Sequence, residues 1–399
     1  MELQKQDRKP YICILGMLTA FGPMCSDIYL PALPEIVNAL ETNTSMAQTT
    51  LAATFLGLAV GQLIIGPLSD AYGRKPMLAW SLVLFIITSA LCAMAIDIGM
   101  LITFRFFQGA AGAGGIVLSR AIACDLFEGE ALTKFMSLLM TVNSVAPMVG
   151  PLVGASLTAF GSFRVIFWFL AVWGVTLLLA SQMRLAETCT VDRSRPALRI
   201  ALGGMCAELR NVRFLLMALS LSVSMSGFFG YLAASPFVFQ EIYGYSSWGY
   251  SAIFALNTMA ISVLGLLAGF HAKRIGNLLV VKGSIAAMLI CGALLTYLAL
   301  DPPQSSVPVA LLLLVFVGMV GPSQAAGFAV AMGTAKGAAG SASGIFGVMS
   351  YAAGALITPV VGVMGDTSML PLGLCMLLTA LMALLLFRAG LRGLDQSKL

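Results

Sequence analysis

A single aspartate stands in the first long apolar run of the chain, in the segment SDIYLP at 26–31. A carboxylate inside a membrane span is costly, and it usually faces a water-filled cavity or a charged partner. Its affinity for protons rises when water leaves and falls beside a cation. In a cavity that alternates between wet and dry, Asp27 can therefore bind and release a proton. The alternative is that Asp27, about 6 Å from the predicted span end, is simply solvated at the outer surface.

Arg105 is the candidate partner of Asp27. It opens the motif RFFQG at 105–109, near the outer end of the fourth apolar run. The first run is predicted to cross the membrane outward and the fourth inward, so both charged residues should lie at a similar depth. Gln108 follows Arg105 one helical turn later on the same face. The alternative is that Arg105 only pairs structurally, or that its side chain reaches outward to the interface.

The segment GPLSDAYGRK at 66–75 lies between the second and third apolar runs. Gly66 and Gly73 permit tight backbone geometry. Asp70 and Arg74 can form charge-assisted hydrogen bonds across helix ends. Such contacts can hold one conformation of a membrane protein closed, so the segment is predicted to be a turn that forms part of a cytoplasmic gate. A plain charged turn is the alternative.

A second charged group stands at the inner end of the fourth run, where Arg120 precedes Asp125. A gating network and a solvated loop are both open interpretations of these two residues. The chain contains one histidine, His271, beside Lys273 and Arg274 in a predicted inner loop. We therefore assign it no role in proton relay.

The fifth apolar run combines prolines with small residues in the sequence PMVGPLVG at 147–154. Small residues at this spacing allow close helix approach, and prolines bend the helix. A bent, closely packed helix can both seal and hinge, so the structural and functional interpretations overlap here. The residues concerned are Pro147, Gly150, Pro151 and Gly154.

These residues must be positioned by elements that lie in lipid. Of the 399 residues 59% are hydrophobic and 10% are charged, and the mean hydropathy is +0.96. Soluble domains carry about 25% charged residues, and about 20 apolar residues span a bilayer. Twelve runs fit that length and predict an all-α membrane protein. They cover roughly 10–31, 47–69, 77–96, 100–123, 133–158, 163–182, 213–236, 248–270, 278–299, 307–331, 340–364 and 368–389.

Lysine and arginine are strongly biased toward one side of these runs. If the N-terminus is cytoplasmic, the outer loops hold only Arg164 as a basic residue. The positive-inside rule therefore predicts that both termini are cytoplasmic. The net charge of +5 is then anchoring charge at the inner face and does not indicate nucleic acid binding. The eight cysteines show no metal-type spacing and no C-x-x-C pair, so no metal site is predicted.

The longest polar stretch divides six apolar runs from six. This predicts an N-terminal bundle at 1–182, a cytoplasmic linker at 183–212 and a C-terminal bundle at 213–399. Three pairs of short motifs recur in the same order at offsets of about 203 to 208 residues, as internal repeats of transporters do. PALPEI at 31–36 corresponds to PFVFQEI at 236–242, PLVG at 151–154 to PVVG at 359–362, and the Gly73-Arg74 turn to KRIG at 273–276. A duplicated six-helix unit is expected.

The segments around Asp27, 66–75, 105–109 and 150–151 together resemble the twelve-span drug:proton antiporter branch of the major facilitator superfamily. SDIYLPALP at 26–34 and GQLIIGPLSD at 61–70 are most similar to its bicyclomycin- and chloramphenicol-resistance group, the Bcr/CflA-type transporters. The resemblance covers the N-terminal half with specific motifs. In the C-terminal half it depends mainly on the span pattern and on ASPF at 234–237.

The resemblance implies twelve transmembrane helices in two pseudo-symmetric six-helix bundles. It also implies proton-driven export of small, often amphipathic drugs across the bacterial inner membrane, by a monomer that needs no cofactor beyond the proton gradient. Asp27 would be the proton-coupling acid and Arg105 its partner, while 66–75 would form the inner gate and 147–154 the antiporter helix. Some relatives carry a second acid two turns before Asp27, where this chain has Thr19. This departure favours coupling to one proton and argues against export of divalent cations.

Candidate substrate-cavity residues are aromatic or amide side chains within the spans. They are Tyr29, Gln108, Phe228, Tyr231, Asn257 and Gln324. Because the spans hold few polar residues, the cavity is expected to be apolar and loosely specific. A carrier of a physiological metabolite, such as an amino acid or a sugar, is the alternative on the same fold, and a scaffold without transport would not need Asp27. No nucleophile with its base, metal cluster or ATP-binding P-loop occurs in the sequence, so an enzyme is not expected.

Overall fold

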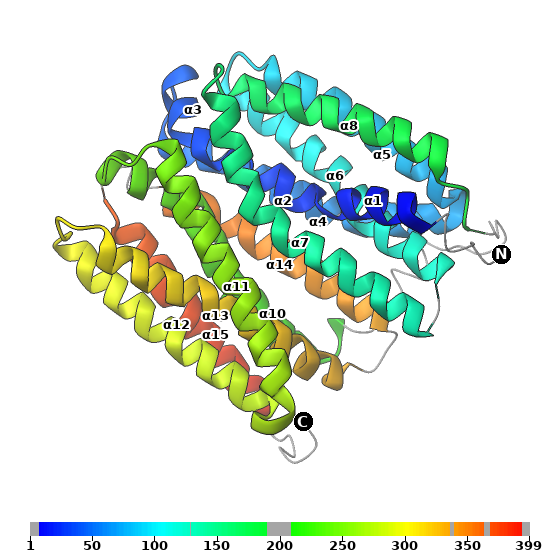
Figure 1. Ribbon diagram of the computed structural model, residues 1–399. Helices are drawn as coiled ribbons and strands as arrows, with labels where there is room; N and C mark the ends of the chain where they lie inside the picture. Colours follow the sequence, from blue (N-terminus) through cyan, green and yellow to red (C-terminus); the bar gives the residue numbers. More distant parts are fainter. Residues whose placement is uncertain (1–7, 128, 190–208, 336–338, 363–367, 393–399) are drawn as a thin grey trace. The chain divides into compact units, whose positions relative to one another are not determined.

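The computed structural model describes residues 8–127, 129–189, 209–335, 339–362 and 368–392. Within these ranges the chain is helical, with no strand (Figure 1). The helices of the N-terminal half are α1 (Arg8–Thr19), α2 (Phe21–Ser26), the short 3₁₀ turn η1 (Leu30–Ala32), α3 (Leu33–Ala39), α4 (Thr44–Tyr72), α5 (Arg74–Ala93), α6 (Ile98–Leu126), α7 (Gly129–Thr158) and α8 (Arg164–Arg184). Those of the C-terminal half are α10 (Val212–Phe237), continued by the π-helical η2 (Val238–Ile242), α11 (Ser247–Ile275), α12 (Asn277–Leu300), α13 (Val307–Thr334), α14 (Ala339–Val361) and α15 (Leu370–Leu391).

Eleven spans in the described ranges are long and apolar enough to cross a membrane. A bent pair of segments, Tyr11–Thr19 and Phe21–Ala39, makes the twelfth. This confirms the predicted all-α membrane fold. The first span is nevertheless broken, whereas the sequence predicted one continuous run over 10–31. Its two parts differ in direction by 44°.

One of the three repeated motif pairs has a similar backbone conformation in both halves. Gly73 joins α4 to α5 with φ of 98°, and Gly276 joins α11 to α12 with φ of 86°. This region of backbone space is costly for residues that carry a Cβ, so both turns need glycine. The predicted loop at 66–75 is, however, helical as far as Tyr72, and Gly73 alone interrupts the helices. Gly66 therefore lies inside α4 and not in a turn.

The helices group into two compact units. One contains residues 1–29 and 53–201, and the other contains 30–52 and 202–399. The sequence placed 30–52 with the N-terminal bundle. Polar contacts attach this segment to the second unit, because Gln48 Nε2 donates to the carbonyl oxygen of Ala233 at 2.9 Å and Ser45 Oγ donates to that of Pro359 at 3.0 Å. Most of the predicted linker, at 190–208, lies outside the described residues.

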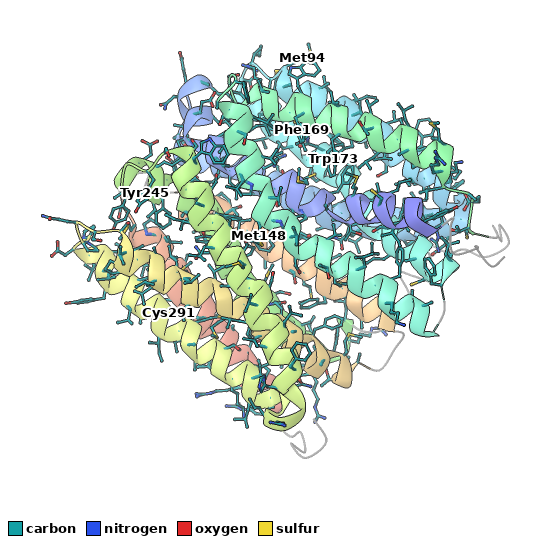
Figure 2. All side chains as sticks on the ribbon, in the orientation of Figure 1. Met94, Met148, Phe169, Trp173, Tyr245 and Cys291 are labelled. Atoms are coloured by element: carbon teal, nitrogen blue, oxygen red, sulfur yellow. The ribbon has the colours of Figure 1, made fainter. Side chains whose placement is uncertain are left out.

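In the first unit, aromatic side chains fill the space between α2, α5 and α8. Phe21 stacks on Trp173 with ring centroids 4.5 Å apart, and it meets Phe85 edge to face at 4.6 Å. Trp173 is labelled on α8 in Figure 2. The α2 segment that precedes Asp27 is therefore held by a rigid aromatic contact.

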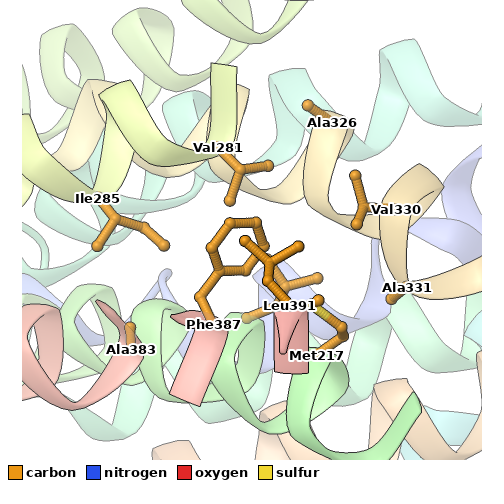
Figure 3. Packing of buried hydrophobic residues seen from close by; sticks show 10 residues of the cluster. Met217, Val281, Ile285, Ala326, Val330, Ala331, Ala383, Phe387 and Leu391 are labelled. Carbon is orange, nitrogen blue, oxygen red and sulfur yellow. The ribbon is translucent and has the colours of Figure 1, made fainter. Parts of the chain in front are cut away.

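In the second unit, a hydrophobic core joins α10, α12, α13 and α15. Met217, Val281 and Phe387 are each at most 1% exposed and meet at its centre (Figure 3). Because these side chains are close-packed, the distances between the four helices cannot change without loss of contact or overlap.

Candidate functional site

Asp27 lies at the break in the first span. Pro23 has no N–H to donate to Thr19, and Pro31 has none to donate to Asp27, so the helix is interrupted on both sides of α2. Asp27 follows the last residue of α2, and its N–H donates to the carbonyl oxygen of Pro23 at 2.7 Å. Its side chain is 3% exposed, and Ser26 Oγ donates to Oδ1 at 2.5 Å. A carboxyl group is thus buried in a turn where the membrane span is not helical.

Arg105 lies on α6 and is completely buried. Its Nη2 donates to the carbonyl oxygen of Cys25 at 2.6 Å, and its Nη1 donates to Gln108 Oε1 at 2.6 Å. The last carbonyl groups of a helix have no partner within the helix. Arg105 therefore satisfies a carbonyl that the break beside Asp27 leaves open.

Aromatic rings complete the surroundings of this cation. The guanidinium lies 4.1 Å from the ring centroid of Tyr29 and 5.6 Å from that of Phe167. Such contacts stabilise a cation by about 2 kcal/mol or more when water is absent. The Nε atom of Arg105 is buried without a hydrogen-bond partner, so the guanidinium retains one unused donor.

The sequence left open whether Arg105 pairs directly with Asp27, and in the described residues no ion pair joins them. Arg74 forms ion pairs with Asp70 and Asp125 instead. The two residues are linked indirectly, because Arg105 bonds to the backbone of the short helix that ends at Asp27. The sequence placed both charges at one depth but could not show that the broken helix offers a carbonyl oxygen to the arginine.

Two predicted cavity residues, Tyr29 and Gln108, belong to this arginine network. Tyr29 packs against the guanidinium, and Gln108 passes the hydrogen-bond chain on by donating from Nε2 to Ser89 Oγ at 2.7 Å. Both side chains are fully buried. Their contact with a substrate stays a prediction.

The predicted antiporter helix packs directly on the segment that carries Asp27. Pro147 and Pro151 both lie inside α7. A Cβ atom added to Gly154 would overlap the carbonyl oxygen of Ile28, whereas one added to Gly150 would lie 3.5 Å from Asp27 Cβ, an ordinary contact. Gly154 therefore permits a close backbone approach beside the buried acid.

A polar cluster forms where α4 meets α5. Arg74 Nη1 contacts Asp70 Oδ1 at 2.5 Å, and Arg74 Nε contacts Asp125 Oδ2 at 3.0 Å. Three of the predicted gate residues thus come together. Arg120 does not join them: it is exposed, and the ion pairs of Asp70 and Asp125 are made with Arg74.

Glu187, just after α8, is a member of this cluster that the sequence did not reveal. Its carboxylate accepts hydrogen bonds from the backbone N–H groups of Arg74 and Lys75 at 2.9 and 3.0 Å. It also accepts from the N–H groups of Thr188 and Cys189. Partial burial opposes ionisation, but these four donors prevail and lower the pKa of Glu187 below its ordinary value of 4.5. The partners on α5 are 113 and 112 residues away in the sequence, so no local pattern could have indicated this contact.

Replacing Glu187 by glutamine should destabilise the protein slightly at neutral pH. The amide keeps the shape but loses an acceptor for the two N–H groups of α5. A lowered folded-state pKa contributes stability above pH 4.5, and that stability is lost as the pH falls through the folded-state value. Because the carboxylate is exposed, we expect a loss within about 1 kcal/mol. Thermal unfolding of both proteins at neutral pH and below the folded-state pKa of Glu187 measures it. The difference should shrink in acid, and an equal difference at both pH values would contradict this assignment.

In the second unit, Tyr231 and Asn257 meet in a buried aromatic cluster. Asn257 Nδ2 donates to the Tyr231 hydroxyl at 2.7 Å, and both residues are at most 1% exposed. The Tyr231 ring stacks on Phe254 at 5.7 Å and on Phe228 at 6.2 Å. Gln324 lies elsewhere, where its Nε2 donates to the carbonyl oxygen of Leu221 at 3.0 Å. Three of the four predicted cavity residues of this half therefore lie together.

Comparison with known proteins identifies the family of the chain. A model of the Major Facilitator Superfamily matches residues 13–359. The uncharacterized MFS-type transporter YdgK of Bacillus subtilis (strain 168) is 36% identical over 96% of this chain and 95% of its own length. The bicyclomycin resistance protein homolog of Haemophilus influenzae is 27% identical over 93% and 94%. A bacterial homolog of the human lysosomal transporter Spinster, solved in an inward-facing and occupied conformation, has the same fold, with a TM-score of 0.78, 13% identity and 98% of both chains covered.

These relatives confirm the resemblance to the Bcr/CflA-type transporters that the N-terminal motifs suggested. The family match covers most of the chain, including the segments that hold Asp27, Arg105 and the Arg74 cluster. The chain therefore belongs to the Major Facilitator Superfamily, as a multi-pass membrane transporter of small molecules and not an enzyme.

Proposed function

We propose that this transporter exports small amphipathic drugs from the bacterial cytoplasm in exchange for protons. The observation that carries the proposal is the buried carboxyl group of Asp27, held in a helix break beside Gly150 and Gly154. An ionisable group inside a membrane span marks an ion or substrate pathway by default. Broken helices commonly form the binding sites of secondary transporters. One protein similar to this chain is named for bicyclomycin resistance, which supports a drug as the substrate.

Coupling follows from competition at one site. Asp27 holds a proton when the site is dry, and releases it when water, a cationic drug or the hydrogen-bond donors of a neutral drug stabilise its ionised form. The transporter loaded with drug turns from the inward-facing to the outward-facing state, and the protonated transporter turns back. Proton entry down its gradient therefore drives drug export. Arg105 positions the acid through the carbonyl of Cys25 and does not itself have to transfer the proton.

The Arg74 cluster serves as the gate in this proposal. Its ion pairs to Asp70 and Asp125 join α4, α5 and α6, and they must break or shift if these helices move. The gate would face the cytoplasm of a bacterial inner-membrane protein whose two termini are both cytoplasmic. No cofactor is needed, because the proton gradient supplies the energy, and a monomer suffices.

Substrate selection is assigned to the aromatic cluster around Tyr231 and Asn257. Small-molecule sites are mostly apolar with a few placed polar groups, and this cluster offers flat rings with one amide and one hydroxyl. A sugar or amino acid would need more fixed donors or charges than these side chains supply.

Everted membrane vesicles from a host that lacks its own drug pumps test the function. An imposed inside-acid proton gradient should partly collapse when a chloramphenicol-like, bicyclomycin-like or cationic compound is added. The collapse should require the transporter and should not follow addition of amino acids or sugars. A response to amino acids or sugars alone would identify a metabolite carrier on the same fold and contradict the proposal.

A further inference from the structure

A groove runs between α12 and α15 at the end where α12 begins and α15 finishes. These helices lie side by side in the second unit. The groove has a volume of about 760 Å³, within the range of roughly 300–1,000 Å³ found for small-molecule sites. Its lining residues are Lys282, Ala286, Leu289 and Ile290 on α12, and Leu384, Phe387, Arg388, Leu391 and Arg392 on α15 or directly after it.

The floor of this groove is closed by packed side chains. Phe387 is 1% exposed and Leu391 is 8% exposed, and both pack into the core that contains Val281 and Ile285 (Figure 3). The groove is therefore a shallow site on the outside of these two helices and does not continue between them as a transport path.

Basic side chains gather at one end of the groove and apolar ones at the other. Arg388 and Arg392 are exposed and Lys282 is half-buried, and none of them takes part in an ion pair of the described residues. Among the residues that the structure describes, no acidic side chain lines the groove. On α12, Ala286 follows Lys282 by four residues, and Leu289 and Ile290 follow Ala286 by three and four, so all of them share one face. The distance from Lys282 to Ile290 is about 12 Å along the helix. Ile290 is 60% exposed.

We propose that this groove binds an anionic phospholipid. The phosphodiester would lie among Lys282, Arg388 and Arg392, and one acyl chain would follow Ala286, Leu289 and Ile290. Arginine side chains donate two hydrogen bonds to a phosphate in one plane, which favours an anionic headgroup. Basic pockets between transmembrane helices bind lipid headgroups of this kind. The helix ends concerned are those that we propose to be cytoplasmic, and the site is separate from the proposed drug path.

If these basic residues served only to anchor the helix ends at the cytoplasmic surface of the membrane, they would not need to line a groove. Arg210 and Arg274 are exposed cations in the same half of the chain, and neither lines this groove. They therefore provide the matched control for charge at the membrane surface.

The test is lipid binding to the purified full chain in detergent, measured by native mass spectrometry. Phosphatidylglycerol and phosphatidylcholine with the same acyl chains are titrated against the wild type, the Arg388→Gln/Arg392→Gln double variant and the Arg210→Gln/Arg274→Gln control. We expect the wild type and the control to prefer phosphatidylglycerol. The groove variant should bind it roughly thirtyfold more weakly, since each basic residue near a headgroup contributes about fivefold.

A second variant tests the acyl-chain wall without changing any charge. Ala286 is exposed, so Ala286→Trp fills the groove while the core behind it remains intact. It should reduce phosphatidylglycerol binding, and soluble glycerol phosphate should not displace the lipid from the wild type. Equal loss in the control, no preference for phosphatidylglycerol, or full displacement by glycerol phosphate would each overturn the proposal.

Discussion

Asp27→Asn leaves the transporter folded and abolishes export against a gradient. Asparagine has nearly the same shape and can still accept the hydrogen bond from Ser26, but it cannot bind and release a proton. In proteoliposomes with an imposed proton gradient, we expect accumulation of drug to fall to the level of empty liposomes. Downhill movement of drug should persist, because the cavity itself is unchanged.

The matched control is Asp301→Asn. Asp301 is an exposed carboxylate directly after α12 and outside the spans. This variant should accumulate drug like the wild type, and both variants should unfold near the wild-type temperature. Accumulation of drug by a folded Asp27→Asn protein would contradict the role of Asp27 in coupling.

Gly154→Ala should destabilise the protein and severely impair transport. The added methyl group would overlap the carbonyl oxygen of Ile28, which is backbone and cannot move aside by a rotamer change. Overpacking of this kind costs about 1–3 kcal/mol. It would also push α7 away from the turn that holds Asp27. Thermal unfolding in detergent and drug export in vesicles measure the two effects.

Gly150→Ala is the control on the same helix. Its methyl group would lie 3.5 Å from both Asp27 Cβ and the backbone nitrogen of Ile28, which is normal packing. We therefore expect near-wild-type stability from it. If Gly150→Ala and Gly154→Ala have equal effects on stability and export, the close approach of α7 to Ile28 is not required for either property.

The sequence predicted the spans well because lipid imposes a simple length and composition rule. Prolines at 23 and 31 stand in the first run, but tolerated prolines are common in membrane helices. From the sequence, a break of the first helix at Asp27 therefore could not be distinguished from a kink in a continuous helix. The loop at 66–75 was misjudged for a related reason, since Asp70 and Tyr72 continue α4 and only the positive φ of Gly73 ends it.

Contacts within the site were harder to predict than its members. Asp27, Arg105 and Gln108 stood out because polar residues are rare in apolar runs. Their partners did not, because Arg105 bonds to a backbone carbonyl and Glu187 bonds to backbone N–H groups. Every residue has such groups, so composition and spacing carry no information about which one is used.

Release of protons on drug binding tests the central claim most directly. Purified protein in weakly buffered detergent solution at neutral pH receives chloramphenicol-like, bicyclomycin-like and cationic compounds in turn, beside the Asp27→Asn variant. We expect a release that depends on the compound, approaches one proton per transporter and is absent from the variant. Drug binding without any release from the folded wild type, or an equal release from the variant, would contradict it.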